Sequence, residues 1–358
     1  MKILHIIPTL EIGGAQKMLS ELVKEQKKLG YDVDVLVYHI VKSKFEINLV
    51  NNGVRIINLN RNSLKGIGII AAIRLHLQEY DIIHTHLFPA LYQVPLSNIG
   101  LNKPLVYTEH NTHNRRRSIK ILRPIEQFLY SKYEKIIAIS PRTKYNLAEW
   151  LHLKGKTMER IVTISNGIDL EPLKSGIGKS VNINAKYILM VSRFSEAKDQ
   201  ETLIKSIQYI KDNNIKIVFA GDGATLELNK QIAKKIGVEH RCIFLGNRND
   251  VPDLIKQSII GVQSSHWEGF GLTAVEFMAA GKPIVASSVD GLMQVVEGAG
   301  LLFKCGDEKE LANNINKLLM DEKYYCDISQ RCRIRAETYD IKSMTKAYCK
   351  LYNEIFLK

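Results

Sequence analysis

The 358-residue sequence lacks a long apolar run, a secretory leader and a paired set of cysteines. No apolar run reaches the roughly 20 residues that span a bilayer, so a transmembrane helix is not expected. The apolar stretch after Met1 is too short for a signal peptide, and no small-residue cleavage site follows it. The five cysteines are odd in number and lack metal-ligand spacing, which argues against disulfides and structural zinc. These absences favour a cytoplasmic protein.

Candidate metal ligands are also scarce. The only Asp-x-Asp pattern, Asp32-Val33-Asp34, runs into an apolar strand, where the period of two explains it better than a metal site does. No Cys-x-x-Cys cluster offers another ligand set. The sequence therefore predicts no bound metal and no cofactor.

Positive charge is unevenly distributed along the chain. Residues 1–166 carry 24 Lys and Arg against 13 Asp and Glu, a net +11, whereas residues 167–358 carry 26 against 24, a net +2. Such a basic half attracts nucleic acid, an anionic membrane or an acidic substrate. No nucleic-acid-binding motif supports the first of these.

Short β-branched runs alternate with helical patterns, which predicts an α/β fold with two doubly wound parallel sheets. The first series of predicted strands covers 2–7, 33–38, 54–57, 81–84, 105–108, 135–139 and 161–164, and the second covers 187–191, 215–220, 243–245, 259–262 and 283–286. The polar segment 166–185 is a predicted linker between domains 1–166 and 167–340. Residues 341–358 have apolar side chains at helical spacing, and we expect this helix to pack back on the N-terminal domain.

The stretch 264–283 carries the most chemical information. It follows a predicted strand and enters a helix near Leu272, which places Glu268 in the loop and Glu276 in the helix. Gly269 and Gly271, on either side of Phe270, permit close approach of the backbone to a ligand. The N–H groups of Leu272 and Thr273 at the helix start form an anion site suited to a diphosphate. The two carboxylates are then suited to accept hydrogen bonds from sugar and ribose hydroxyls.

Other candidates lie in loops that follow predicted strands. Arg193 and Lys198 follow the strand 187–191 and could stabilise a leaving diphosphate, although a solvated basic pair is the simpler alternative. Gly13 and Gly14 follow the first strand and either approach a phosphate or supply a tight turn with positive φ. The Gly221-Asp222-Gly223 segment lacks the third glycine of a dinucleotide fingerprint, which disfavours an NAD site.

Histidines follow two other strands. His110 comes after the strand 105–108, and a role in hydrogen bonding or proton handling suits a side chain that titrates near neutral pH. His84 and His86 flank Thr85 at the end of another predicted strand. Either one of them reaches the cleft while the other packs, or both have structural roles. His113 has no assigned role.

These motifs resemble the signature of glycosyltransferase family 4, retaining enzymes of the GT-B fold. The resemblance rests on Glu268-Gly-Phe-Gly-Leu with Glu276 and Gly281-Lys282-Pro283, and extends to the segments at 13–16, 81–86, 108–111, 165–169, 192–198 and 220–223. It implies that Glu276 binds the donor ribose, Glu268 the donor sugar hydroxyls, and Arg193 with Lys198 the diphosphate. It also places Gly14 and His110 near the reacting sugar and aligns Asn247 and Arg248 with a segment whose backbone reads the nucleobase.

The resemblance predicts a metal-independent, retaining transfer of a hexose or related sugar from a nucleotide diphosphate sugar, a UDP-sugar before a GDP-sugar. The N-terminal domain would bind a glycan or lipid-linked acceptor used in surface polysaccharide synthesis. A nucleotide-sugar 2-epimerase and a non-catalytic sugar-nucleotide-binding protein remain alternatives. Retention of both glutamates and both cations argues against the second alternative.

A basic and apolar segment suggests peripheral contact with the inner face of a membrane. Arg115, Arg116, Arg117, Lys120 and Arg123 are interleaved with Ile119, Ile121 and Leu122, and Ile125, Phe128 and Leu129 follow. Cations near an anionic leaflet and inserted apolar side chains together favour reversible attachment. The alternative is a solvated loop followed by a helix that packs its apolar face on the sheet.

Overall fold

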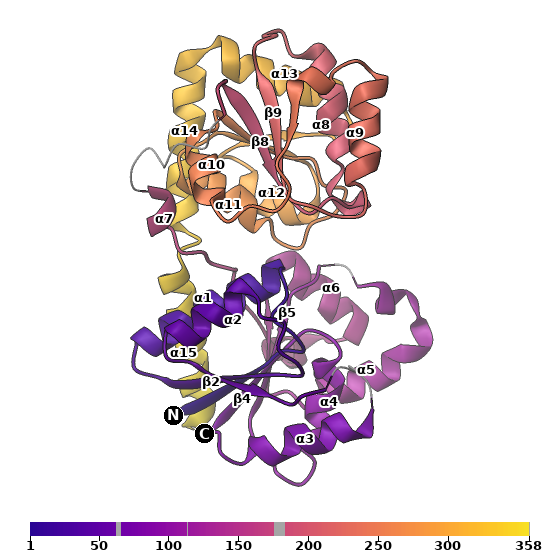
Figure 1. The fold of residues 1–358 in the computed structure, drawn as a ribbon. Helices are drawn as coiled ribbons and strands as arrows, with labels where there is room; N and C mark the ends of the chain where they lie inside the picture. Colours follow the sequence, from indigo (N-terminus) through magenta and orange to yellow (C-terminus); the bar gives the residue numbers. More distant parts are fainter. Residues whose placement is uncertain (62–65, 113, 175–182, 358) are drawn as a thin grey trace. The chain divides into compact units, whose positions relative to one another are not determined.

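The protein forms two compact units (Figure 1). A computed structural model describes residues 1–61, 66–112, 114–174 and 183–357. The N-terminal unit comprises Met1–Gly167 and Ile341–Lys358, and the C-terminal unit comprises Ile168–Asp340. His113 and residues 175–182 of the predicted linker lie outside the described residues.

The N-terminal unit is built on a seven-stranded sheet in the order β3-β2-β1-β4-β5-β6-β7, with every pair parallel. Its strands are β1 (Lys2–Ile6), β2 (Asp32–Val37), β3 (Arg55–Asn58), β4 (Ile82–His86), β5 (Leu105–Glu109), β6 (Lys135–Ala138) and β7 (Ile161–Thr163). The chain adds strands on one side of β1 and then on the other. The order therefore reverses between β1 and β4.

Helices cover both faces of this sheet. One apolar core holds side chains of α1 (Gly14–Lys28), α2 (Lys44–Asn51) and α15 (Ile341–Phe356). The core on the opposite face holds side chains of α3 (Ile67–Leu77), α4 (Ala90–Ser97), α5 (Arg123–Tyr130) and α6 (Pro141–Leu151). The C-terminal helix α15 thus packs inside the N-terminal unit, where Met344, Tyr348 and Tyr352 are buried.

The C-terminal unit has a six-stranded parallel sheet in the order β10-β9-β8-β11-β12-β13. Its strands are β8 (Tyr187–Val191), β9 (Lys216–Ala220), β10 (Cys242–Phe244), β11 (Ile260–Gln263), β12 (Ile284–Ser287) and β13 (Leu301–Phe303). Its helices are α7 (Glu171–Lys174), α8 (Gln200–Ser206), α9 (Leu226–Lys235), α10 (Val251–Gln257), α11 (Leu272–Ala279), α12 (Asp290–Val296), α13 (Glu308–Met320) and α14 (Glu322–Glu337). Figure 1 shows α8, α9 and α13 on one side of the sheet and α10, α11 and α14 on the other.

The predicted α/β class with two doubly wound parallel sheets is confirmed. Strand limits shift by one or two residues, and the strand β13 was not predicted. The predicted linker contains a short helix, α7, among its described residues. Among the described residues, no helix combines the length and apolar character needed to cross a bilayer.

Local signals explain several helix starts. Ser43 caps α2 in a capping box with Glu46, and Ser140 caps α6 by accepting from the Thr143 N–H at 3.0 Å, with Pro141 as the first helical residue. Such caps satisfy N–H groups that the helix itself leaves unpaired. They fix where each helix begins relative to the strand before it.

Candidate active site

Two loops of the C-terminal unit meet where its strand order reverses, between β8 and β11. The loop after β8 carries Arg193 and Lys198, and the loop after β11 carries Glu268. Ser264 Oγ donates to the Asp199 carbonyl at 2.6 Å, and the His266 N–H donates to the Ala197 carbonyl at 2.9 Å, which ties the loops together. Ligands of open α/β sheets bind at this position, beyond the carboxyl ends of the strands.

The backbone of the Arg193 loop is held in place by hydrogen bonds from Gln200, which was not among the predicted site residues. Gln200, at the start of α8, is 1% exposed, and its Nε2 donates to Ser192 Oγ and to the Arg193 carbonyl, both at 2.9 Å. Arg193 itself is exposed. No sequence motif marks Gln200, because its role depends on the loop folding back over the helix.

Lys198 and Glu268 form an ion pair through Lys198 Nζ and Glu268 Oε2. Their side chains are 23% and 20% exposed. The Glu268 Oε1 atom also accepts from the Gly269 N–H at 3.1 Å. The structure thus brings a predicted phosphate ligand and a predicted sugar ligand into direct contact.

Glycine is required where this loop turns into α11. Gly271 has φ +88°, in the left-handed region, and a Cβ there would lie 2.7 Å from Leu292 Cδ2. A Cβ on Gly291 of α12 would lie 2.1 Å from the Glu268 carbonyl oxygen, so α12 also approaches the loop closely. Gly291 is a second positioning residue that the sequence analysis missed.

The Phe270 side chain, predicted among the donor-binding residues, is buried inside the C-terminal unit. It is 4% exposed and packs edge-on against Tyr339, with ring centroids 5.4 Å apart. An aromatic ring gains more from this buried contact than from exposure in a polar loop. Only the Phe270 backbone is left for a donor.

The helix α11 starts directly after Gly271, as predicted. Leu272 and Thr273 supply its first N–H groups, and Glu276 follows one turn later, so these residues share a face. Glu276 is 8% exposed. A ligand at the helix start would therefore meet both N–H groups and a carboxylate.

The loops after β9 and β10 frame the other side of β8. Gly221 and Gly223 have φ of +144° and +152°, and a Cβ at these positions would lie 1.9 Å from the Ser192 carbonyl oxygen and 2.2 Å from that of Phe194. These glycines serve close packing of two loops, which explains them without a dinucleotide. The Gly221 N–H also donates to the Gly246 carbonyl at 2.7 Å, next to exposed Asn247. Arg248 forms an ion pair with Asp250, with Nη2 to Oδ2 at 2.5 Å.

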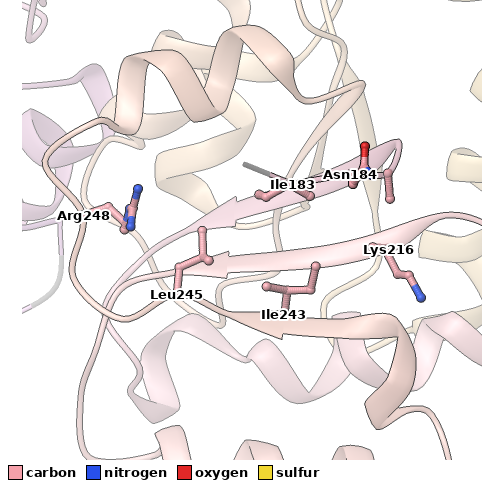
Figure 2. Close-up of a pocket in the computed structure, with 7 residues that line it drawn as sticks. Ile183, Asn184, Lys216, Ile243, Leu245 and Arg248 are labelled. Carbon is pink, nitrogen blue, oxygen red and sulfur yellow. The ribbon is translucent and has the colours of Figure 1, made fainter. Parts of the chain in front are cut away.

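A separate pocket of about 570 Å³ lies along the edge strand β10 (Figure 2). Ile183, Asn184, Ala185, Lys216, Ile243, Leu245 and Arg248 line it. Of the predicted site residues, only Arg248 is among them. The pocket is therefore not the site formed by Lys198, Glu268 and α11.

In the N-terminal unit, Gly14 is exposed at the first position of α1, where Gly13 is the N-cap. The interpretation of these glycines as a turn with positive φ is wrong, because Gly13 has φ −171°, and neither is among the glycines in that region. Gly13 has extended backbone, and α1 begins at the next residue. A role for Gly14 in binding a ligand stays a prediction.

His110 follows β5 and is 8% exposed. Its Nε2 lies 3.1 Å from His86 Nδ1, and burial lowers its pKa from 6.5 to about 3. Of the two alternatives for His84 and His86, the structural role is the one observed, because both are fully buried in β4. Burial lowers their pKa values well below 6.5 as well.

The predicted basic surface is largely internal. Arg117 Nη2 lies 2.6 Å from Glu109 Oε2, and Arg116 Nε lies 3.3 Å from Glu126 Oε1. Both glutamate side chains are 0% exposed, and the arginine side chains are 11% and 17% exposed. The prediction that Arg116 and Arg117 face an anionic surface is therefore wrong, since two buried carboxylates need these cations.

Glu109 is an anchor that the sequence analysis missed. Tyr130 OH donates to Glu109 Oε2 at 2.9 Å, and the Asn111 N–H donates to Oε1 at 3.2 Å. These bonds hold the backbone on both sides of His110. Its role was not readable because Arg117 and Tyr130 approach it only in the folded chain.

Further along the same segment, Arg123 lies over the Trp150 ring, with its Cζ 4.7 Å from the ring centroid, whereas Lys120 is exposed. The apolar side chains of Ile119, Ile121, Ile125 and Phe128 are 49%, 82%, 53% and 55% exposed. The alternative of a helix that packs its apolar face on the sheet holds in part, because α5 buries Leu129 and Tyr130 but leaves Ile125 and Phe128 exposed. Part of that face is open to solvent.

A group of buried histidines is a geometric candidate for a metal site that sequence spacing did not indicate. One nitrogen from each of His5, His84 and His86 lies within 4.8 Å of the others. Both ring nitrogens of each histidine, however, have hydrogen-bond partners in the protein.

The Asp-x-Asp pattern at 32–34 lies in β2, in line with its interpretation as part of a strand. Asp34 Oδ2 accepts a hydrogen bond from Tyr80 OH at 2.6 Å.

Two Rossmann-like parallel sheets, with the candidate site in loops at the carboxyl ends of the strands, are the architecture of GT-B glycosyltransferases. Comparison with protein families agrees: residues 12–172 match Glycosyltransferase Family 4, and residues 178–335 match Glycosyl transferases group 1. The chain belongs to the glycosyltransferases of family 4.

Named relatives cover most of the chain at low identity. The chain is 24% identical to a D-inositol 3-phosphate glycosyltransferase of Corynebacterium glutamicum, over 97% of this chain and 93% of that protein. It is 26% identical to the Escherichia coli UDP-Gal:alpha-D-GlcNAc-diphosphoundecaprenol alpha-1,3-galactosyltransferase, over 72% and 71%.

Solved structures share the fold. Anabaena Alr3699/HepE, crystallised with UDP and glucose, matches with a TM-score of 0.88 at 23% identity, over 99% of this chain and 100% of that one. Sucrose-phosphate synthase from Thermosynechococcus elongatus matches with a TM-score of 0.83 at 19% identity, over 100% of each chain. The predicted GT-B fold is confirmed.

Proposed function

We propose that this glycosyltransferase moves a sugar from a UDP-sugar to a glycan or lipid-linked acceptor of surface polysaccharide synthesis, with retention of the anomeric configuration. The observation that carries the proposal is the contact of Lys198 with Glu268 beside the start of α11, at the point where the strand order reverses. The Anabaena structure contains UDP and glucose, and the E. coli relative is named for UDP-Gal and a diphosphoundecaprenol acceptor. Both support the choice of donor and acceptor class.

Each group at this site has a role that its chemistry supports. Arg193, Lys198 and the N–H groups of Leu272 and Thr273 bind the diphosphate, and Glu276 accepts from the ribose hydroxyls. Asn247 lies beside the nucleobase, while Gly14 and His110 serve the reacting sugar. Charge builds on the leaving diphosphate as the glycosidic bond breaks, so fixed cations stabilise the transition state more than the ground state.

The ion pair suggests how the donor engages. A diphosphate competes with Glu268 for Lys198, because both are anions. Release of Glu268 then provides a carboxylate for the hydroxyls of the transferred sugar. Donor binding and exposure of the sugar-binding carboxylate are coupled in this scheme.

The decisive experiment measures release of nucleoside diphosphate from a panel of nucleotide sugars, with and without candidate acceptors. Transfer requires release that depends on the acceptor, and NMR of the product gives its anomeric configuration. A changed sugar in the recovered nucleotide would instead indicate a 2-epimerase. Binding without any turnover would indicate a non-catalytic protein.

A matched pair of variants assigns the site in that assay. Glu268→Ala should reduce turnover more than affinity for UDP, because this carboxylate is assigned to the transferred sugar. Glu297→Ala, an exposed glutamate of the same unit, is the control and should retain wild-type activity. Equal activity of Glu268→Ala and wild type removes Glu268 from the site.

Membrane contact belongs to this proposal in a revised form. We assign it to the exposed apolar side chains Ile119, Ile121, Ile125 and Phe128, with Lys120 exposed between the first two. Lys132 Nζ lies 4.5 Å from the centroid of the Phe128 ring, so a second cation accompanies the apolar group. Apolar side chains that insert beside lysines give reversible binding to an anionic leaflet.

Co-sedimentation with anionic liposomes at low and high salt tests this contact. The double variant Ile121→Ser with Phe128→Ser should bind less than wild type, while Leu75→Ser, which changes a side chain 78% exposed on α3, should bind normally. Changing Arg116 or Arg117 is unsuitable because their ion pairs are internal. Absence of wild-type binding at low salt rules out the contact.

A further inference from the structure

A continuous row of hydrogen bonds connects Gln26 in α1 to His110, which follows β5 in the N-terminal unit. His5 Nε2 lies 2.9 Å from Gln26 Oε1, His5 Nδ1 lies 3.0 Å from His86 Nε2, and His86 Nδ1 lies 3.1 Å from His110 Nε2. Gln26, His5 and His86 are fully buried, and His110 is 8% exposed. We call these four residues the histidine row.

Each imidazole in the histidine row carries a single proton at neutral pH. Burial lowers the pKa of His5 to about 4 and that of His110 to about 3, and it lowers the pKa of His86 well below 6.5. A neutral imidazole has one N–H donor and one bare nitrogen acceptor. The three hydrogen bonds must therefore all run in the same direction.

Gln26 determines in which direction these three hydrogen bonds run. Its Oε1 only accepts, so the proton of His5 lies on Nε2 and His5 Nδ1 accepts from His86. The proton of His86 is then on Nε2, and His86 Nδ1 accepts from His110. His110 is left with its proton on Nε2 and a lone pair on Nδ1.

The His110 Nδ1 atom is buried and has no hydrogen-bond partner among the residues that the structure describes. A buried acceptor without a partner is costly, so a ligand that supplies a donor gains affinity there. A sugar hydroxyl can donate, whereas an ionised phosphate oxygen cannot. The bare nitrogen thus selects for a hydroxyl.

We propose that Gln26, His5 and His86 are positioning residues that hold His110 in the Nε2–H tautomer, so that Nδ1 accepts a hydrogen bond from a hydroxyl of the bound sugar. The choice of a sugar as ligand rests on the proposed function. His110 in this state orients substrate and does not serve as a proton donor, because its one proton is committed to His86. Gln26 therefore influences substrate recognition without contacting the substrate.

A metal ion at His5, His84 and His86 is the competing use of these side chains. Coordination would need a lone pair from each ring, but His84 Nε2 lies 2.8 Å from Thr108 Oγ1, and His84 Nδ1 pairs with Tyr352 OH. The remaining nitrogens belong to the histidine row. A dication would also enter a fully buried group with no carboxylate among its ligands.

Nitrogen NMR of the full-length protein labelled with ¹⁵N-histidine tests the tautomer directly, with the His110 signals assigned by their loss in His110→Asn. The wild type should show a protonated Nε2 and an unprotonated Nδ1 at His110. Gln26→Met removes the acceptor and should give His110 a mixture of tautomers. Gln93→Met is the matched control, since buried Gln93 accepts from Tyr38 OH at 2.5 Å on α4.

A proton on Nδ1 in the wild type, or His110 signals unchanged in Gln26→Met, overturns the proposal. The wild-type spectrum decides the tautomer even if Gln26→Met fails to fold. Zinc alone should leave the wild-type signals in place, and their replacement by metal-bound signals would make the cluster a metal site instead.

Kinetics supply the second readout. Gln26→Met should weaken donor-sugar recognition about tenfold, seen in KM for the UDP-sugar, while affinity for UDP alone stays within about twofold. Equal losses for both ligands would indicate a structural role and contradict the proposal. If the tautomer is as stated but no nucleotide sugar is turned over, the proposed function fails while the histidine row stands.

Discussion

The two units use their charged and titratable groups in opposite ways. In the N-terminal unit, Glu109 and Glu126 are fully buried against arginines, and four histidines are buried in neutral form. In the C-terminal unit, Lys198 and Glu268 meet in partly exposed loops beyond the strands. The net charge of +11 on residues 1–166 therefore does not measure how much positive charge this unit exposes to solvent. The same difference predicts that removal of a carboxylate lowers the stability of the N-terminal unit but lowers ligand affinity in the C-terminal unit.

Acid should produce the largest effect, and it should act through the N-terminal unit. The pKa values of His5, His84, His86 and His110 are lowered by folding, so the unfolded state binds protons below pH 6.5 that the folded state does not. Stability is therefore full above that pH and falls with acidification. Each histidine should contribute about 2 kcal/mol of loss between about pH 7 and pH 5.

Urea unfolding at a series of pH values measures this loss. Carboxylates titrate mainly below this window, so the change reports histidine. A free energy of unfolding that is flat from neutral pH down to about pH 5 would contradict the buried, neutral state.

Glu126→Ala should be the next largest effect. It leaves Arg116 without its carboxylate and removes the acceptor for Trp150 Nε1, which donates at 2.6 Å. Loss of one partner of a buried pair costs about 3–5 kcal/mol. Urea unfolding is the measurement, and exposed Glu159→Ala in the same unit, expected within about 0.5 kcal/mol of wild type, is the control.

Glu276→Ala tests the opposite expectation in the C-terminal unit. Loss of a charged acceptor for the ribose hydroxyls should weaken UDP binding by about 1.5–3 kcal/mol, which is about ten- to hundredfold in Kd. Calorimetric titration measures the affinity, with Glu297→Ala as control. Unchanged affinity would remove Glu276 from the donor site.

Lys198→Met should separate binding from stability most sharply. Its ion pair with Glu268 is partly exposed, so the free energy of unfolding should change by no more than about 1 kcal/mol. Turnover should nevertheless fall, because the diphosphate loses a cation in the transition state. A large loss of stability with normal turnover would reverse the assignment.

Removal of metal should have the smallest effect. Arg193, Lys198 and the start of α11 provide the positive field that a metal would supply elsewhere. Activity after EDTA treatment should match that of the untreated enzyme. Loss of activity that magnesium restores would overturn the metal-independent mechanism.

Much of the fold and part of the site were readable from the sequence. Strand runs separated by helical patterns gave both sheets, and glycines before Leu272 gave the start of α11, because these are local preferences of the backbone. The burial of Phe270 and of the arginines at 116 and 117 was not predicted. Exposure depends on neighbours distant in the chain, such as Tyr339, Glu126 and Glu109, and no spacing within a motif reports them.

The sequence by itself determined the α/β class, the family and the loops in which Arg193, Lys198, Glu268 and Glu276 lie, since each follows from short-range pattern. Only the tertiary structure decided the partners: Lys198 with Glu268, Gln200 beneath the Arg193 loop, and Gln26 at the end of the histidine row. Hydrogen bonds and ion pairs act over a few ångströms. They are therefore fixed by the packing of sheets and helices, which brings together residues far apart in the chain.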